Sequence, residues 1–199
     1  MSKGDSFYYK ALQKIRLGNG KEKYLQALPF LTRASSMGNS KALYALATWY
    51  LHGRCVRRDY RKAVSLLKKS AYKKNREARF DLAIAYETGK GVKQNLRRAY
   101  ELYKLAATQG EKLAKLELAR CYNHGIGVKL SRTKAHYWYK AAAKAGFVEA
   151  QFVTACNYEL GEGIRQNIRY ALCWYRKAAK QGDIAAKKAI ASILANKKK

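Results

Sequence analysis

Five alanines stand 36 residues apart along this 199-residue chain, with no insertion between them. Much of the surrounding sequence repeats in the same frame. A fixed period of this length is typical of stacked-repeat proteins, in which each unit buries its apolar face on its neighbours. The period therefore predicts the architecture almost alone, and it indicates packing rather than catalysis as the reason for most recurring residues. The alanines are Ala42, Ala78, Ala114, Ala150 and Ala186.

Each unit begins with a predicted helix. With the alanine at offset 0, mostly small or apolar residues recur at offsets 0, 4, 5 and 8, which lie on one face of an α-helix. A glycine follows at offset 11, and glycine ends helices because it accepts the left-handed conformation. The offset-8 tyrosines are Tyr50, Tyr86, Tyr122 and Tyr158, and the glycines are Gly53, Gly89, Gly125 and Gly161.

A second helix is predicted after a short loop. Offset 17 carries a polar residue suited to cap a helix N-terminus, namely Asp59, Asn95, Ser131 or Asn167. This helix ends at a glycine in three units, at Gly110, Gly146 and Gly182. The first full unit has Lys74-Asn75 there, and we expect the asparagine to act as the left-handed cap.

The two ends of the array depart from the repeat. Residues 6–41 fit the frame as an eroded copy in which Pro29 lies inside the second helix, where it should kink the helix or remove a hydrogen bond. Residues 186–196 read as a final capping helix, followed by a basic tail at 197–199. We therefore expect one all-α domain over 6–196, with units 6–41, 42–77, 78–113, 114–149 and 150–185.

The motif Leu-Ala-x-x-Tyr-x-x-Gly-x-Gly-Val, the polar cap, and Trp-Tyr-x-Lys-Ala-Ala with its closing glycine resemble Sel1-like repeats, relatives of tetratricopeptide repeats. Residues 138–142 and 174–179 match best. The resemblance implies a right-handed α-α superhelical solenoid of helix-turn-helix repeats, with the first helix of each pair lining a concave face. It also implies an adaptor or scaffold, in many cases bacterial, and supplies no catalytic residue.

Cysteines and histidines do not form a recognisable site in the sequence. The four cysteines occupy four different offsets, which favours reduced, mostly buried thiols over a repeated disulfide. His52-x-x-Cys55 and Cys121-x-x-His124 resemble zinc half-sites, but they lie two repeats apart, too far to share one metal. His136 reads as surface or packing. No metal, cofactor or enzymatic activity is predicted.

Composition bears on the partner and the compartment. The formal net charge is +29, and it is concentrated toward the N-terminus: residues 42–77 carry +8 and residues 150–185 carry +2. An acidic protein, a nucleic acid backbone or an anionic membrane surface would each be attracted. No apolar run is long enough to span a bilayer, and the N-terminus lacks a secretory signal. These features predict a cytoplasmic protein, with signal-independent secretion left open.

A row of cations is the most informative part of this charge. Offset 15, a loop position where the Sel1-like pattern asks for no base, is basic in all five units, and offset 19 adds three arginines in the first turn of the second helix. Cations there oppose the helix dipole. The row is therefore either a binding edge or a solvated face. Its members are Lys21, Arg57, Lys93, Lys129, Arg165, Arg61, Arg97 and Arg169.

The leading hypothesis is a non-catalytic adaptor that binds an acidic protein through the concave groove and the basic edge. The alternative is sequence-nonspecific nucleic-acid binding by the basic N-terminal half. Groove residues are expected at offsets 2, 6, 9 and 10, although the aromatic residues at offset 2 could instead pack between repeats. The predicted groove residues are Tyr44, Thr48, Leu51, His52, Phe80, Ile84, Glu87, Leu116, Arg120, Asn123, His124, Phe152 and Cys156.

Overall fold

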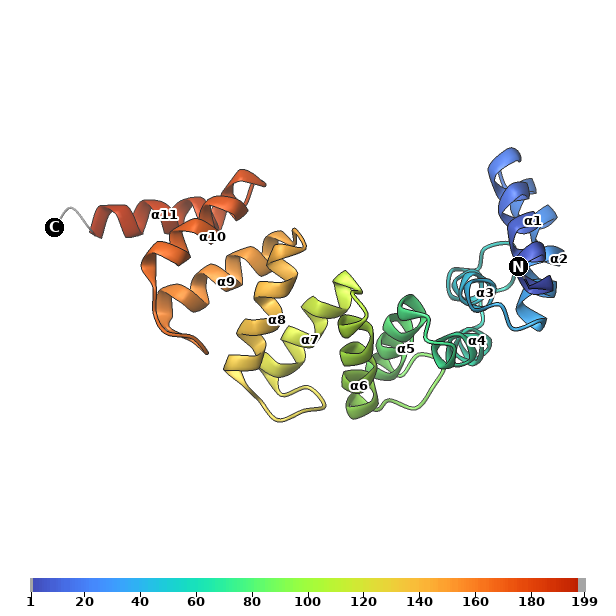
Figure 1. Cartoon of the computed structure of the whole chain (residues 1–199), viewed down its shortest axis with the longest axis horizontal. Coiled ribbons are helices and arrows are strands. Elements are labelled where there is room, and N and C mark those ends of the chain that lie inside the picture. Colours follow the sequence, from blue (N-terminus) through green and yellow to red (C-terminus); the bar gives the residue numbers. More distant parts are fainter. Residues whose placement is uncertain (1, 197–199) are drawn as a thin grey trace. The chain divides into compact units, whose positions relative to one another are not determined.

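The computed structural model describes residues 2–196, and over that range the chain consists of eleven α-helices without a strand (Figure 1). This confirms the predicted all-α fold. The helices are α1 (Lys3–Leu17), α2 (Glu22–Ser36), α3 (Ser40–His52), α4 (Tyr60–Tyr72), α5 (Arg76–Thr88), α6 (Leu96–Thr108), α7 (Lys112–His124), α8 (Arg132–Lys144), α9 (Val148–Leu160), α10 (Ile168–Lys180) and α11 (Ile184–Asn196).

Consecutive helices pack as hairpins and the hairpins stack. The chain forms two compact units, residues 1–109 with α1–α6 and residues 110–199 with α7–α11. Within unit 1, successive hairpins contact each other through α2 with α3 and α4 with α5; within unit 2, α8 packs on α9 and α10 on α11. Each unit is therefore a short helical repeat solenoid. No helix within residues 2–196 has the length and hydropathy needed to cross a bilayer.

The structure confirms the predicted glycine C-caps of the first helices and the predicted polar N-caps of the second helices. The four glycines at offset 11 adopt φ between 68° and 79° and close the first helix of each full repeat. The four polar residues at offset 17 cap the second helix, each side chain accepting the backbone N–H three residues later. Local sequence chemistry therefore sets the hairpin boundaries.

One cap differs from the prediction. Lys74, and not Asn75, takes the left-handed conformation, with φ of 62°. Asn75 instead caps the start of α5, where its side-chain oxygen accepts the N–H of Ala78 at 2.7 Å. The asparagine is held by the next helix, so the lysine must adopt the conformation that glycine holds in the other repeats.

The core consists of small residues at the helix contacts and large residues between them. All five repeat-marking alanines have 0 % exposure, which lets neighbouring helices approach closely. Tyr103 and Tyr175, on the second helix of their repeats, are the largest fully buried side chains. Each donates its hydroxyl to a glutamate of the first helix, Glu87 at 2.7 Å and Glu159 at 2.5 Å. These bonds tie the two helices of a hairpin together.

Successive hairpins meet backbone to backbone at the loop. A Cβ built on Gly91 would lie 2.3 Å from the carbonyl oxygen of Tyr60, the first residue of the preceding hairpin's second helix. Gly163 stands in the same relation to Arg132. Only glycine permits this approach. At the equivalent loop position the first full repeat has Cys55, whose Sγ lies 3.7 Å from the carbonyl oxygen of Lys21.

Loop length and helix start positions at the two ends of the array differ from those of the full repeats. The loop between α1 and α2 has four residues where the full repeats have seven, and α2 starts two residues earlier than the repeat frame predicts. Pro29 lies inside α2, as predicted. The final helix begins at Ile184, two residues before the predicted start, because Asp183 accepts the N–H of Ala186 and caps it. The predicted tail 197–199 lies outside the described residues.

Candidate functional site

The thirteen predicted groove residues lie on α3, α5, α7 and α9, the first helix of each full repeat, and each is half-buried or exposed. Seven belong to unit 1 and six to unit 2. The structure brings three of them, Leu51, His52 and Ile84, to the wall of one cavity in unit 1.

This cavity, the groove pocket, has a volume of about 450 Å³ and lies between α3, the start of α4 and α5. Apolar side chains of α3 and α5 form part of its wall, and charged groups from two loops and from the middle of α5 stand beside them. Sequence reasoning missed most of the charged members. Its residues are Leu51, His52, Arg58, Tyr60, Asp81, Ile84, Ala85, Thr88 and Lys90.

Several other predicted groove residues make contacts within their own hairpin. Phe80 and Phe152 pack against Tyr103 and Tyr175 of the second helix, with ring centroids 5.7 Å and 5.5 Å apart. The aromatic at offset 2 therefore packs within a repeat in these two units, and not between repeats. The hydroxyl of Thr48 donates to a backbone carbonyl of its own helix.

In unit 2 three of the predicted groove residues make separate polar contacts. Arg120 pairs with Glu117 at 2.7 Å, and Asn123 accepts a hydrogen bond from Arg132. The thiol of Cys156 lies 3.2 Å from the Tyr175 hydroxyl, and burial raises the pKa of both groups. Since both stay protonated at neutral pH, this arrangement supplies no nucleophile.

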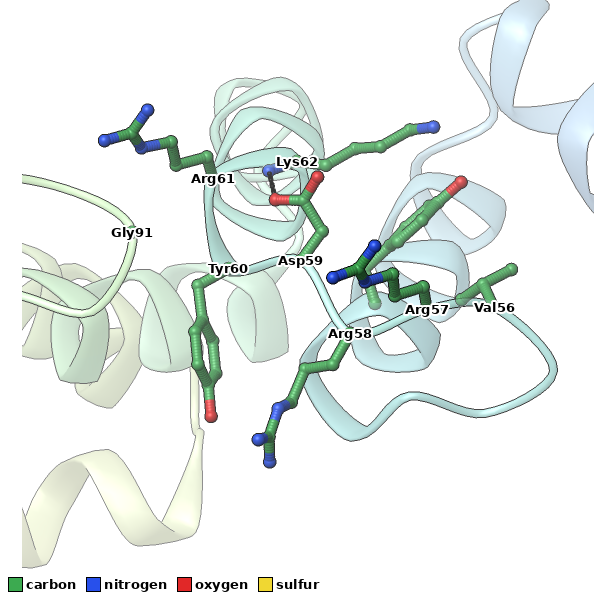
Figure 2. Close-up of a pocket in the computed structure, with 9 residues that line it drawn as sticks. Val56, Arg57, Arg58, Asp59, Tyr60, Arg61, Lys62 and Gly91 are labelled. Atoms are coloured by element: carbon green, nitrogen blue, oxygen red, sulfur yellow. Dashed lines mark hydrogen bonds between the residues drawn. The ribbon is translucent and has the colours of Figure 1, made fainter.

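A second cavity, the basic hollow, lies beside the groove pocket and shares Arg58 and Tyr60 with it. Its volume is about 760 Å³, and it surrounds the first turn of α4 (Figure 2). Figure 2 shows Arg58 and Tyr60 pointing to one side, while Arg61 and Lys62 leave the helix in different directions. The positive charge is therefore spread over a broad surface. The hollow is formed by Tyr50, Val56, Arg57, Arg58, Asp59, Tyr60, Arg61, Lys62 and Gly91.

The charge in this hollow is not compensated internally. Among the described residues, no acidic side chain forms an ion pair with any of its four cations. The carboxylate of Asp59 accepts the backbone N–H of Lys62 at 2.9 Å and so caps α4. Arg58 and Lys62 lie against tyrosine rings, but an acidic group arriving from outside would find four cations that no carboxylate already pairs with.

The eight predicted basic-edge residues are all exposed. Arg97 forms an exposed pair with Glu101, and such a pair contributes little. The loop and first helical turn carry five cations and one acid over residues 54–62, but two cations and one acid over residues 162–170. The basic edge is therefore strongest in unit 1, where it adjoins the groove pocket.

Arg58 is the functional candidate that the sequence could have revealed. At the same offset, Gln94 and Gln166 donate their side-chain amides to the backbone carbonyls of Glu87 and Glu159 at 2.7 Å. Arg58 replaces this bracing amide, and its guanidinium carbon instead lies 5.5 Å from the centroid of the Tyr60 ring. A departure from the repeat at this loop position was the available signal.

The recurring tyrosines have cations or a ring against them. Lys62, Arg98 and Lys134 lie over Tyr50, Tyr86 and Tyr122, with the cation 4.5 to 5.7 Å from the ring centroid. In the last full repeat, Tyr170 packs against Tyr158 with centroids 5.4 Å apart. These rings are engaged within the protein, which weakens the case for a platform on which nucleic-acid bases stack.

The thiols depart from expectation, whereas His136 takes the packed position that was one of its two predicted settings. Only Cys121 is buried; Cys55 and Cys156 are half-buried and Cys173 is exposed, so the prediction of mostly buried thiols is wrong. His136 is 4 % exposed, and neither ring nitrogen has a hydrogen-bond partner. Burial lowers its pKa, aided by nearby Lys140. Over the described chain, no group of three or more His, Cys, Asp or Glu side chains could hold a metal ion.

Stacked helical hairpins closed by glycine caps and lacking strands over the described residues define a helical repeat protein. The Sel1 repeat family model matches residues 40–75, 76–111, 112–147 and 148–183, and the chain belongs to this family. The matched repeats begin two residues before the predicted unit boundaries, at the start of the first helix. Sel1 repeat proteins generally mediate protein–protein interactions, and their solenoid is typically a non-catalytic scaffold.

Solved structures of bacterial proteins share this fold. A Sel1 repeat protein from Oxalobacter formigenes is 27% identical, with a TM-score of 0.83 over 94% of this chain and 77% of its own. A protective antigen of uropathogenic Escherichia coli with an SLR fold is 28% identical, with a TM-score of 0.83 over 97% of this chain and 44% of its own. An immunity protein from Pseudomonas aeruginosa shares the fold at 23% identity. Its TM-score is 0.52 over 94% of this chain and 68% of its own. No curated protein matches significantly.

Proposed function

We propose that this chain is a non-catalytic adaptor that binds an acidic protein segment through the groove pocket and the basic hollow of unit 1. The observation that carries the proposal is their contiguity: Arg58 and Tyr60 line both cavities. An extended segment can place an apolar side chain between Leu51 and Ile84 while its carboxylates contact the basic hollow.

The spread of the cations favours a segment with several carboxylates over a single small anion. Arg57 and Arg58 leave the loop before α4, and Arg61 and Lys62 leave its first turn. The four side chains spread in different directions, so one compact ion cannot contact them all (Figure 2). Each exposed charge pair is worth roughly 0.2 to 1 kcal/mol, so four pairs supply about 1 to 4 kcal/mol of the roughly 8 kcal/mol that micromolar binding requires, and apolar contacts in the groove pocket must supply much of the rest. The proposed setting is the cytoplasm.

Binding to a nucleic acid backbone is the competing outcome. It would use the same cations but would not need the apolar wall of Leu51 and Ile84 in the groove pocket, where Asp81 would repel a phosphate. The recurring tyrosines Tyr50, Tyr86 and Tyr122 are covered by cations and so are not open for base stacking. Substitutions in the groove pocket should therefore weaken binding of a protein segment but not binding of a nucleic acid backbone.

The test captures partners from native lysate with the full chain, with and without nuclease, and measures the purified partner's affinity at rising salt. Two variants probe the site: Ile84→Glu in the groove pocket, and Arg57→Glu with Arg61→Glu in the basic hollow. Arg165→Glu with Arg169→Glu is the matched control, because these arginines occupy the same offsets in unit 2.

We expect a nuclease-resistant protein partner. Ile84→Glu should weaken its binding at all salt concentrations. The Arg57/Arg61 reversal should weaken binding about tenfold at about 0.05 M salt, more than the unit 2 reversal does, and less as salt rises, because screening shortens the range of the charges. Loss of all binding on nuclease treatment, or equal binding by Ile84→Glu, would overturn the proposal.

A further inference from the structure

A third cavity in unit 1 shares no residue with the groove pocket or the basic hollow. This cavity, the α2–α4 pocket, has a volume of about 600 Å³ and lies between the C-terminal half of α2, the start of α3 and the second half of α4. Leu43 and Leu66 provide its apolar wall, and Thr32 lines it from α2.

The pocket arises where the array departs from its repeat. Offset 26 carries a long cation in the four full units, Lys68, Lys104, Lys140 and Arg176, and Thr32 in the first hairpin. In unit 2, Lys140 reaches the next hairpin and donates to the Tyr158 hydroxyl at 2.8 Å. The short threonine side chain cannot make such a reach, and it leaves space between α2 and α4.

The rim of the pocket combines exposed charge with an exposed aromatic ring. Lys68, Lys69 and Lys73 line it, and all three are exposed. Among the described residues none of these lysines is ion-paired, and no acidic residue lines the pocket. Tyr72, also on the rim, is 89% exposed. Such a ring contributes nothing to the core, whereas tyrosine is enriched among the residues that dominate interfaces.

On the side of the α2–α3 turn, the rim of the pocket is formed by the side chain of Lys73. A Cβ built on Gly38 would lie 3.3 Å from Cε of Lys73, so the aliphatic stem of this lysine passes over the turn between α2 and α3. The stem extends the apolar wall while the ammonium group stays at the rim. The Lys68 ammonium also lies 5.9 Å from the centroid of the Tyr86 ring, but none of the three lysines has a carboxylate partner among the described residues. An apolar interior bordered by these lysines complements an apolar side chain flanked by carboxylates.

We propose that the α2–α4 pocket is a second docking site, which takes an aromatic or large aliphatic side chain from an acidic peptide segment. The apolar anchor fills the space beside Leu43 and Leu66. Its flanking carboxylates pair with Lys68, Lys69 and Lys73, and Tyr72 covers the anchor from the rim. This site is independent of the groove pocket, so it goes beyond the proposed function and does not require it.

The test selects binders from a displayed library of peptides of about 12 residues rich in Asp and Glu, with the remaining positions random. Affinities of the enriched synthetic peptides are measured by fluorescence polarisation against the full chain. Thr32→Lys and Thr32→Trp both reduce the pocket volume, the first adding a positive charge and the second none. Tyr72→Ser removes the rim ring, and Thr133→Lys adds the same charge at an exposed position of unit 2. Circular dichroism checks that each variant is folded.

We expect enriched peptides to contain an aromatic or large aliphatic residue next to acidic ones. Both Thr32 variants should weaken their binding tenfold or more and Tyr72→Ser about fivefold, while Thr133→Lys changes it less than twofold. Tighter binding by Thr32→Lys with no effect of Thr32→Trp would show association by net charge alone and overturn the proposal. Peptides without an apolar residue, or no enrichment, would also overturn it.

Failure here can be told apart from failure of the proposed function. Peptides that lose affinity with Ile84→Glu and keep it with both Thr32 variants occupy the groove pocket. That result supports the proposed function and contradicts a site between α2 and α4. Peptides with the opposite dependence support the second docking site alone.

Discussion

The close contact between the Gly91 loop and the start of α4 allows the packing of successive hairpins to be tested by adding one methyl group. Gly89 and Gly91 lie two residues apart in one loop with φ of 74° and 75°, so an alanine suffers the same left-handed strain at either position. The contacts of the added methyl differ. At Gly89 the nearest atom would be 3.6 Å away, whereas at Gly91 the carbonyl oxygen of Tyr60 would be 2.3 Å away.

The expected magnitudes follow from this difference. Left-handed strain costs roughly 1 to 2 kcal/mol, and the reduced entropy of the unfolded chain offsets about 0.4 to 1 kcal/mol of it. Gly89→Ala should therefore lower the free energy of unfolding by about 1 kcal/mol. Gly91→Ala adds a clash with main-chain atoms that cannot rotate away, and overpacking of this kind costs about 1 to 3 kcal/mol more.

The assay is urea unfolding, measured by tryptophan fluorescence in a background with Trp138→Phe and Trp174→Phe, so that Trp49 reports on unit 1 alone. Gly163→Ala and Gly161→Ala repeat the comparison in unit 2, where the corresponding distances are 2.3 Å and 3.5 Å, with helical circular dichroism as the readout. Equal losses of stability for Gly91→Ala and Gly89→Ala would refute the reasoning, because strain alone would then explain both.

Three further outcomes are expected. Lys74→Gly should raise the free energy of unfolding by about 0.5 to 1 kcal/mol, measured by urea denaturation, because it relieves a left-handed lysine. The pKa of His136 is lowered in the folded state, so the unfolded chain binds the extra proton and stability should fall as pH drops below about 6.5. His136→Leu, which copies Leu172 at the same offset, should reduce that loss when urea midpoints are compared at high and low pH. Asp59→Ala should lower the melting temperature by a few degrees, since a lost cap costs about 1 kcal/mol.

The sequence predicts this fold well because its repeats depend on local chemistry. Glycine caps, polar N-caps and apolar spacing each act within a few residues, and four copies remove chance agreement. The left-handed conformation of Lys74 was not predicted, because Asn75 could either end α4 in that conformation or cap the start of α5. It caps α5, so Lys74 takes the left-handed conformation. The sequence left two settings open for His136, surface or packing, and the structure buries it because the neighbouring helices close over it.

The candidate site is less predictable from the sequence because it depends on departures from the repeat. Helical offsets selected Leu51, His52 and Ile84, which line one cavity, but they said nothing of the loop residues that complete the pocket. Arg58 and Thr32 are visible in an alignment of the units as exceptions. Arg58 adds an exposed cation to the basic hollow, and Thr32 lines the α2–α4 pocket. Neither cavity can be read from the sequence, because its other walls come from neighbouring helices.

The contact between Gly91 and the start of α4 also bears on how such a protein can change over evolutionary time. The joint requires glycine on one side and only main-chain atoms on the other, so a duplicated hairpin that keeps its loop glycine fits its neighbour without compensating side-chain changes. Surface positions of the same loop are free to vary, as Arg58, Gln94, Leu130 and Gln166 show at one offset. Recognition can therefore diversify one hairpin at a time on an inherited frame, and new specificity requires few concerted mutations.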